Sequence, residues 1–254
     1  MILSKRVALG GTQLDSLHAG IVVLGVDPGT PEESISAVSR MGGYGKRVTG
    51  EHWETLDVVV TYAIDIPKKQ MQLRKQIFDS VNTWALGKGW LTVNWMPGRR
   101  MYVDKVILPS SGDVWDWTKQ YEIIFRSYGV PFWQDATATT STGSSIDVPG
   151  MVQTVCDVEV TNSGSSTIDS LTVTVGNSSM SFENLGLEAD EVLKIGHTET
   201  GLLTIRIYET AYTYRDAMAK RAGTSADDLY VNPGSNSITV SAGSKSVSCF
   251  GRYV

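Results

Sequence analysis

The sequence has few cysteines and no long apolar run. Its two cysteines, Cys156 and Cys249, show no CxxC or Cys/His spacing, so they predict buried thiols and no metal site. Sequence alone leaves open whether they pair, because a disulfide requires a specific distance. The longest apolar run, Ile21–Val26, is far shorter than the roughly 20 residues of a membrane span. Polar residues at 12, 13 and 15 also interrupt any signal peptide.

Basic charge is not in excess. The formal net charge is -5; residues 1–135 hold 15 Lys and Arg against 14 Asp and Glu, and residues 136–254 hold 7 against 13. Sequence-specific binding to duplex DNA needs a basic surface that neutralises phosphates. We therefore do not expect such binding.

Recognisable catalytic and metal-binding motifs are absent. The chain has no G-x-S-x-G, P-loop, H-E-x-x-H or calcium-loop pattern, and its three histidines (His18, His52 and His197) are scattered. The glycine-containing stretch Gly42–Arg47 lacks the third glycine of a dinucleotide loop and is interpreted as a mobile loop. Two acidic groups, Glu188/Asp190/Glu191 and Asp227/Asp228, are interpreted as solvated turns and not as paired catalytic carboxylates. No enzyme activity and no cofactor are predicted.

The composition is that of a folded chain with two domains. It has 254 residues, of which 41% are apolar and 19% charged. Residues 136–149 contain almost no large apolar side chain, which is typical of a linker. The sequence thus predicts one domain over residues 1–135 and a second over residues 150–254.

In the first domain, Leu56–Ile66 is rich in β-branched residues and predicts a strand, and helical spacing of apolar residues predicts a helix over 67–86. Lys68, Lys69, Arg74 and Lys75 near the helix start are interpreted as a solvated face, with a partner's acidic surface as the alternative. Alternating runs between Gly89 and Ser127 predict an antiparallel meander.

A turn in this meander carries the candidate interface residues. Pro97 and Gly98 fit the two central positions of a type II turn. The residues after it are Arg99, Arg100 and Met101. They either keep the hairpin soluble or contact a neighbouring subunit, since Arg and Met are enriched at interfaces.

The second domain consists of short alternating runs separated by Gly, Ser and Asn, which predicts an antiparallel sandwich. Within the insertion 211–226, Thr213–Gly223 predicts a short helix or helical turn. The chain ends with two further alternating runs after the turn Asn232–Asn236. We expect these runs to be core strands of the sandwich.

The order of these elements resembles the distal tail protein (Dit, or siphovirus tail component) family of long-tailed bacteriophages. In the first half the matching stretches are "RMGGYGKRVTGEHWETLDVVVTYAI", "MQLRKQIFDSVNTWALGKGWL", "RRMYVDKVIL" and "YEIIFRSYGVPFWQD". In the second half they are "DVEVTNSGSSTIDSLTVTVG" and "DDLYVNPGSNSITVSAGSKSVSCFGRYV". The chain departs from the family pattern in the insertion 211–226.

The resemblance implies a mainly β protein with one α-helix: a split β-barrel-like first domain and a galectin-like antiparallel β-sandwich. It also implies a homo-hexameric ring at the tail tip or baseplate of the virion, synthesised in the host cytoplasm. That ring would join the tail tube protein to the tip hub protein and to receptor-binding proteins. Its channel would pass DNA without specific binding.

Two other functions stay open on sequence. A carbohydrate-binding module is the first; all seven Trp lie at or before Trp133, which weakens it, although Tyr208, Tyr212 and Tyr214 could substitute. A cell-wall-degrading enzyme is the second, and it lacks an acid/base pair. Fold likeness alone does not decide between them.

Overall fold

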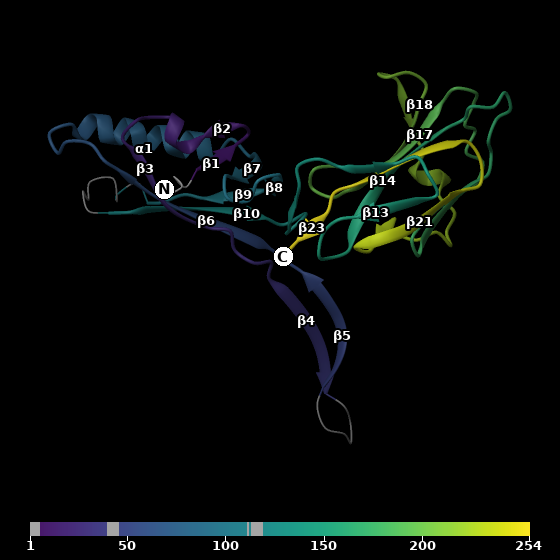
Figure 1. The fold of residues 1–254 in the computed structure, drawn as a ribbon, viewed down its shortest axis with the longest axis horizontal. Helices are drawn as coiled ribbons and strands as arrows, with labels where there is room; N and C mark the ends of the chain where they lie inside the picture. The colour runs from purple at the N-terminus through teal and green to yellow at the C-terminus, as the bar shows by residue number, and fades with distance from the viewer. Residues whose placement is uncertain (1–5, 40–45, 111, 113–118) are drawn as a thin grey trace. The chain divides into compact units, whose positions relative to one another are not determined.

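A computed structural model describes residues 6–39, 46–110, 112 and 119–254 (Figure 1). It divides into two compact units, residues 1–133 and 134–254. The expected fold class is confirmed: the chain is mainly β, and the described residues contain one α-helix and open sheets without a closed barrel. Within those ranges, no helix is long and apolar enough to cross a lipid bilayer.

The first unit contains ten strands, a 3-10 turn and the helix among its described residues. They are β1 (Val7–Leu9), β2 (Thr12–Gln13), η1 (Leu14–Ser16), β3 (Ile21–Asp27), β4 (Glu33–Ser39), β5 (Lys46–Trp53), β6 (Leu56–Ile64), α1 (Met71–Ala85), β7 (Gly89–Val93), β8 (Arg99–Val103), β9 (Lys105–Ile107) and β10 (Tyr121–Ser127). Strands β2, β1, β7 and β8 pair in that order, and β3, β6, β10 and β9 form a second sheet. Strands β4 and β5 pair with each other.

The expected meander is split between these two sheets. Strand β8 pairs with β7, whereas β9 pairs with β10. The chain changes sheet at Asp104, whose carboxylate accepts hydrogen bonds from the backbone N–H groups of Tyr128 (2.7 Å) and Gly129 (3.0 Å). The part of the expected meander over residues 113–118, like residues 42–45 of the expected loop, lies outside the described residues.

Helix α1 covers the sheet that contains β6 and β10 (Figure 1). Its apolar side chains Ile77, Phe78 and Val81 are buried, as the helical spacing predicts. Arg74 departs from the expected solvated face, because its side chain is 1% exposed. Its guanidinium donates hydrogen bonds to the Ile64 carbonyl (2.8 Å) and to the Tyr121 hydroxyl (2.8 Å). These hydrogen bonds offset the cost of burying a charged group in the core.

The second unit is an antiparallel sandwich with short edge elements. Its elements are β11 (Trp133–Asp135, at the boundary), β12 (Thr139–Ser141), β13 (Ser145–Val148), β14 (Thr154–Thr161), β15 (Leu171–Val175), β16 (Ser178–Phe182), β17 (Val192–His197), β18 (Leu203–Tyr208), β19 (Tyr214–Asp216), η3 (Met218–Lys220), β20 (Tyr230–Val231), β21 (Gly234–Val240), β22 (Ser244–Cys249) and β23 (Arg252–Tyr253). One sheet has the order β12-β22-β14-β17-β18-β19, with β20 also on β14, and the other has the order β13-β21-β15-β16. Alternate residues of both sheets, such as Val158 and Val173, form one buried core.

The two C-terminal runs are core strands, as expected, but they lie in different sheets: β21 pairs with β15 and β22 pairs with β14. Asn236 fixes the turn before them, because its amide donates to the carbonyls of Asn232 (2.7 Å) and Gly234 (2.8 Å). Gly234 has φ +92°, a conformation that favours glycine.

Two expectations for this unit need correction. The expected linker 136–149 contains β12 and β13, which pair with β22 and β21. Edge strands need few apolar side chains, and Ile146 and Val148 supply the buried ones. Thr213–Gly223, where a short helix or helical turn was expected, contains the single 3-10 turn η3, but it begins with strand β19, because residues 214–216 pair with β18.

Candidate functional site

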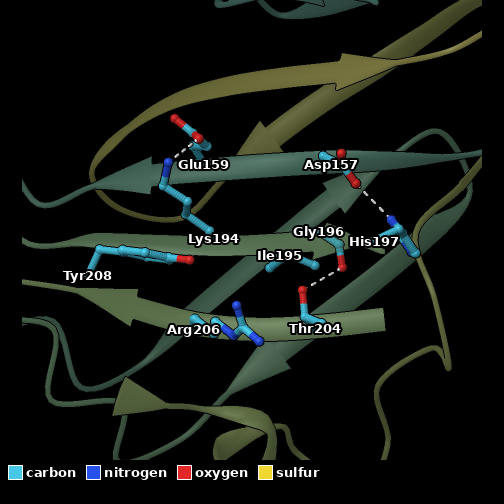
Figure 2. Close-up of a pocket in the computed structure, with 9 residues that line it drawn as sticks. All are labelled: Asp157, Glu159, Lys194, Ile195, Gly196, His197, Thr204, Arg206 and Tyr208. Carbon is cyan, nitrogen blue, oxygen red and sulfur yellow. Dashed lines mark hydrogen bonds and ion pairs between the residues drawn. The ribbon is translucent and has the colours of Figure 1, made fainter. Parts of the chain in front are cut away.

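A polar hollow lies on the outward face of β14, β17 and β18, on the second unit (Figure 2). Strand alternation places it there, because Val158, Ile195 and Ile205 point into the core and their neighbours point outward. Its volume is about 170 Å³. The side chains and glycine around it are Asp157, Glu159, Lys194, Gly196, His197, Thr204, Arg206 and Tyr208, with Ile195 at its base.

A charged row crosses the three strands. Glu159 lies opposite Lys194, and Lys194 lies opposite Arg206 in the strand register. The Lys194 ammonium donates to Glu159 Oε1 at 2.7 Å and lies 5.1 Å from the centre of the Tyr208 ring. The hollow therefore has both donors and acceptors, and no large excess of either charge.

Gly196 gives the hollow its depth. It has no side chain, and an added Cβ would lie 3.7 Å from the Asp157 carboxylate. Across the hollow, the Thr204 hydroxyl donates to the Gly196 carbonyl at 3.1 Å. The hydroxyl keeps its acceptor capacity for a ligand.

His197 closes one end of the hollow and is buried, with a side chain 7% exposed. Its Nδ1 donates to Asp157 Oδ1 (2.7 Å) and its Nε2 donates to Asp228 Oδ1 (2.9 Å). Burial opposes the charged form, but the hydrogen bonds of the two carboxylates outweigh it and raise the pKa of His197 to about 9. This imidazolium fixes the Asp157 carboxylate at the wall of the hollow.

Among the described residues, the other two histidines and the acidic group Glu188/Asp190/Glu191 form no comparable cluster. His18 accepts a hydrogen bond from the Gly20 backbone, and His52 lies beside Glu54. Glu191 is occupied by Arg215, with two contacts of 2.6 Å. Among the residues that the structure describes, no group of three His, Cys, Asp or Glu side chains is arranged to hold a metal ion.

The expected buried thiols are confirmed. Cys156 and Cys249 are free, buried and directly opposite each other on β14 and β22. Burial raises the pKa of Cys249 to about 11 and that of Cys156 further, so both are thiols at neutral pH.

The candidate interface residues lie in the first unit. Arg100 places its guanidinium 3.8 Å from the centre of the Trp90 ring, and Trp90 packs edge-on against Tyr102. Arg99 is half-buried at the start of β8. Met101 is fully buried, so its side chain belongs to the core of the subunit and is not available to a neighbour.

The tyrosines that could replace Trp in a sugar site lie around the β18–β19 hairpin. Tyr208 and Tyr214 are cross-strand partners with ring centres 5.4 Å apart, and Tyr212 is 94% exposed. Sequence reasoning did not find the hollow, because His197 is 40 residues from Asp157 and 31 from Asp228, and only the tertiary structure brings the three side chains together.

Comparisons with known proteins identify the fold. No protein-family model matches the sequence, and no curated protein matches it either. The structure is similar to the crystal structure of SPP1 Dit, described as a paradigm of the hub adsorption apparatus in phages that infect Gram-positive bacteria, with 12% identity and a TM-score of 0.69. That alignment covers 98% of this chain and 99% of the SPP1 chain.

A second similar structure is a chain of the phage P2 baseplate in its activated conformation with Ca. Its identity to this chain is 8% and its TM-score is 0.51, over 97% of this chain and 98% of the other. Both alignments run through both units. This chain therefore has the fold of the phage distal tail protein Dit, over almost its entire length.

Proposed function

We propose that the chain is the structural hub of a bacteriophage tail tip: a homo-hexameric ring, located in the virion, that joins the tail tube to the tip and receptor-binding proteins. The ring encloses the channel through which DNA is ejected. The observation that carries this proposal is the end-to-end similarity to a hub protein, with 98% and 99% of the two chains covered. The role is structural and requires no catalytic group.

Two surfaces of the first unit support this proposal. A closed ring needs two different complementary patches on each subunit. One is the outward face of β7 and β8, where the Arg100 guanidinium lies 3.8 Å from the centre of the Trp90 ring and Trp90 packs against Tyr102. Arg, Trp and Tyr are enriched at the centres of protein interfaces.

The other patch is the outward face of the sheet β3-β6-β10-β9. Val59, Ile124 and Ile107 lie side by side in its register. Ile107 is 38% exposed, and Val22 and Leu24 on β3 are 42% and 38% exposed. Apolar faces of this kind are typical of surfaces that a partner covers.

The position of the chain in the particle tests this function. Antibody raised against the purified chain, with a gold label, should bind intact particles of the encoding phage at the tail end farthest from the capsid. Label on the capsid or along the tail shaft, or absence of the chain from purified particles, would contradict the proposal.

A further inference from the structure

We propose that the hollow on β14, β17 and β18 is a binding site for one sugar ring, a hexopyranose unit with neighbouring free hydroxyl groups. The proposed hub function does not involve this hollow. The site lies in the second unit and is independent of ring assembly, so the two proposals can fail separately.

The size of the hollow limits the ligand. Its volume of about 170 Å³ accommodates a single small ring and is below the roughly 300–1,000 Å³ of pockets that hold larger ligands. Gly196 lines the hollow without a side chain, and Thr204 lies beside it. A ring can therefore approach the sheet closely at this point.

The chemistry of the walls favours hydroxyl groups. Asp157 and Glu159 accept hydrogen bonds, whereas Lys194 and Arg206 donate them. A sugar hydroxyl does both, so two adjacent hydroxyls can donate to a carboxylate and accept from a guanidinium. A phosphate could accept from Lys194 and Arg206, but its oxygens cannot donate to the two carboxylates, so hydroxyl groups match this mixed lining better.

The polar groups are held in place before a ligand arrives. Asp157 is fixed by His197 at 2.7 Å, and Glu159 is fixed by Lys194 at 2.7 Å. Arg206 interacts with the Tyr208 hydroxyl and with the charge of Asp216, and its guanidinium lies over the Tyr214 ring, 4.4 Å from the centre. Preorganised polar groups bind more tightly, because less freedom is lost on binding.

Aromatic rings border the same hollow. Tyr208 lines it, and Tyr214 packs against Tyr208 at 5.4 Å. A tyrosine combines an apolar ring with a polar hydroxyl, which matches the C–H groups and hydroxyls of a pyranose. Donors, acceptors and an aromatic surface together distinguish this hollow from an ordinary polar strand face.

Titration calorimetry on the full chain tests the ligand class. The probes are the methyl glycosides of glucose, galactose and N-acetylglucosamine, with inorganic phosphate as the contrasting anion. At least one glycoside should bind saturably and more tightly than phosphate. Failure of all three to bind, or tighter binding of phosphate, would overturn the proposal.

Two variants test the site itself. Arg206→Met and Thr204→Val should each weaken binding of that glycoside, Arg206→Met by about tenfold or more, because it removes a charged hydrogen-bond donor. The matched control is Lys220→Met on the exposed turn η3, which should leave affinity unchanged. Thermal melting identifies any variant that fails to fold. Unchanged affinity in a folded Arg206→Met or Thr204→Val chain would overturn the assignment.

Discussion

At the residue scale, His197 is a buried titratable group that is held by carboxylates on both sides of its ring. Both of its ring nitrogens lie within 3.0 Å of carboxylate oxygens of Asp157 or Asp228. Ionised carboxylates only accept hydrogen bonds, so both nitrogens must donate and the ring carries a proton on each. Arg252 interacts electrostatically with Asp228, so it also contributes to the charge around this cluster.

Stability should depend on pH through this residue. The pKa of His197 is raised from 6.5 to about 9 in the folded chain. Its contribution is therefore fully present below pH 6.5 and is lost as the pH rises to 9. The free energy of unfolding of the second unit should fall over this range by at most about 3 kcal/mol, since one pKa unit corresponds to about 1.4 kcal/mol.

Denaturant unfolding at a series of pH values measures this effect. His197→Gln keeps a hydrogen-bonding side chain but cannot be protonated, so its stability should vary much less between pH 6.5 and 9. His52→Gln, on an exposed histidine, is the matched control and should keep the wild-type slope. A His197→Gln chain with the full wild-type slope would refute the role of the imidazolium.

At the element scale, the insertion 211–226 protects a sheet edge. Strand β16 is the last strand of its sheet, and the segment after η3 bonds to its free side. The Ala222 and Ala226 backbone N–H groups donate to the carbonyls of Ser181 (2.8 Å) and Ser179 (2.9 Å). Ser225 Oγ accepts from the Ser181 N–H at 2.9 Å. Exposed sheet edges pair with other chains, and this segment occupies the edge.

Removing the Ser225 hydroxyl should weaken this cover. Ser225→Ala leaves the Ser181 N–H without its acceptor, which should lower the free energy of unfolding by about 1–3 kcal/mol. Thr224→Ala, at an exposed neighbouring position, should change it by less than about 0.5 kcal/mol. Denaturant unfolding of both variants measures the difference, and equal stabilities would show that the segment does not support β16.

The elements with strong periodicity could be predicted from the sequence. Apolar spacing located α1 to within a few residues of its bounds, and alternation located β6, β21 and β22. Segments with weak apolar periodicity were predicted wrongly where pairing with distant strands determines the structure. Strands β12 and β13 are edge strands made mostly of small polar residues, so their composition resembled a linker.

Side-chain environments were harder to predict than elements. The charge on Arg74 predicted an exposed side chain. Instead the side chain is buried, and its guanidinium donates hydrogen bonds to the Ile64 carbonyl and the Tyr121 hydroxyl. Met101 follows two arginines, yet alternation along β8 turns it inward. The hollow depends on pairing between β14, β17 and β18, which no local pattern specifies.

At the scale of the whole molecule, we expect the two units to have different roles in assembly. The outward faces of the first unit present apolar, aromatic and arginine side chains, which suit a ring interface. The second unit has polar outward strand faces and a covered edge. We expect the first unit to form the ring contacts and the second unit to remain outside them.

The mass of the purified full chain in solution tests this account most directly. Light scattering should give a mass of six copies, or of two stacked rings, for the wild-type chain. Arg99→Glu with Arg100→Glu should shift the mass toward one copy without loss of the folded far-ultraviolet spectrum, because the charge reversal removes the cation stacked on Trp90. A wild-type chain that is monomeric at every concentration, both alone and with its tail tube protein, would contradict the account.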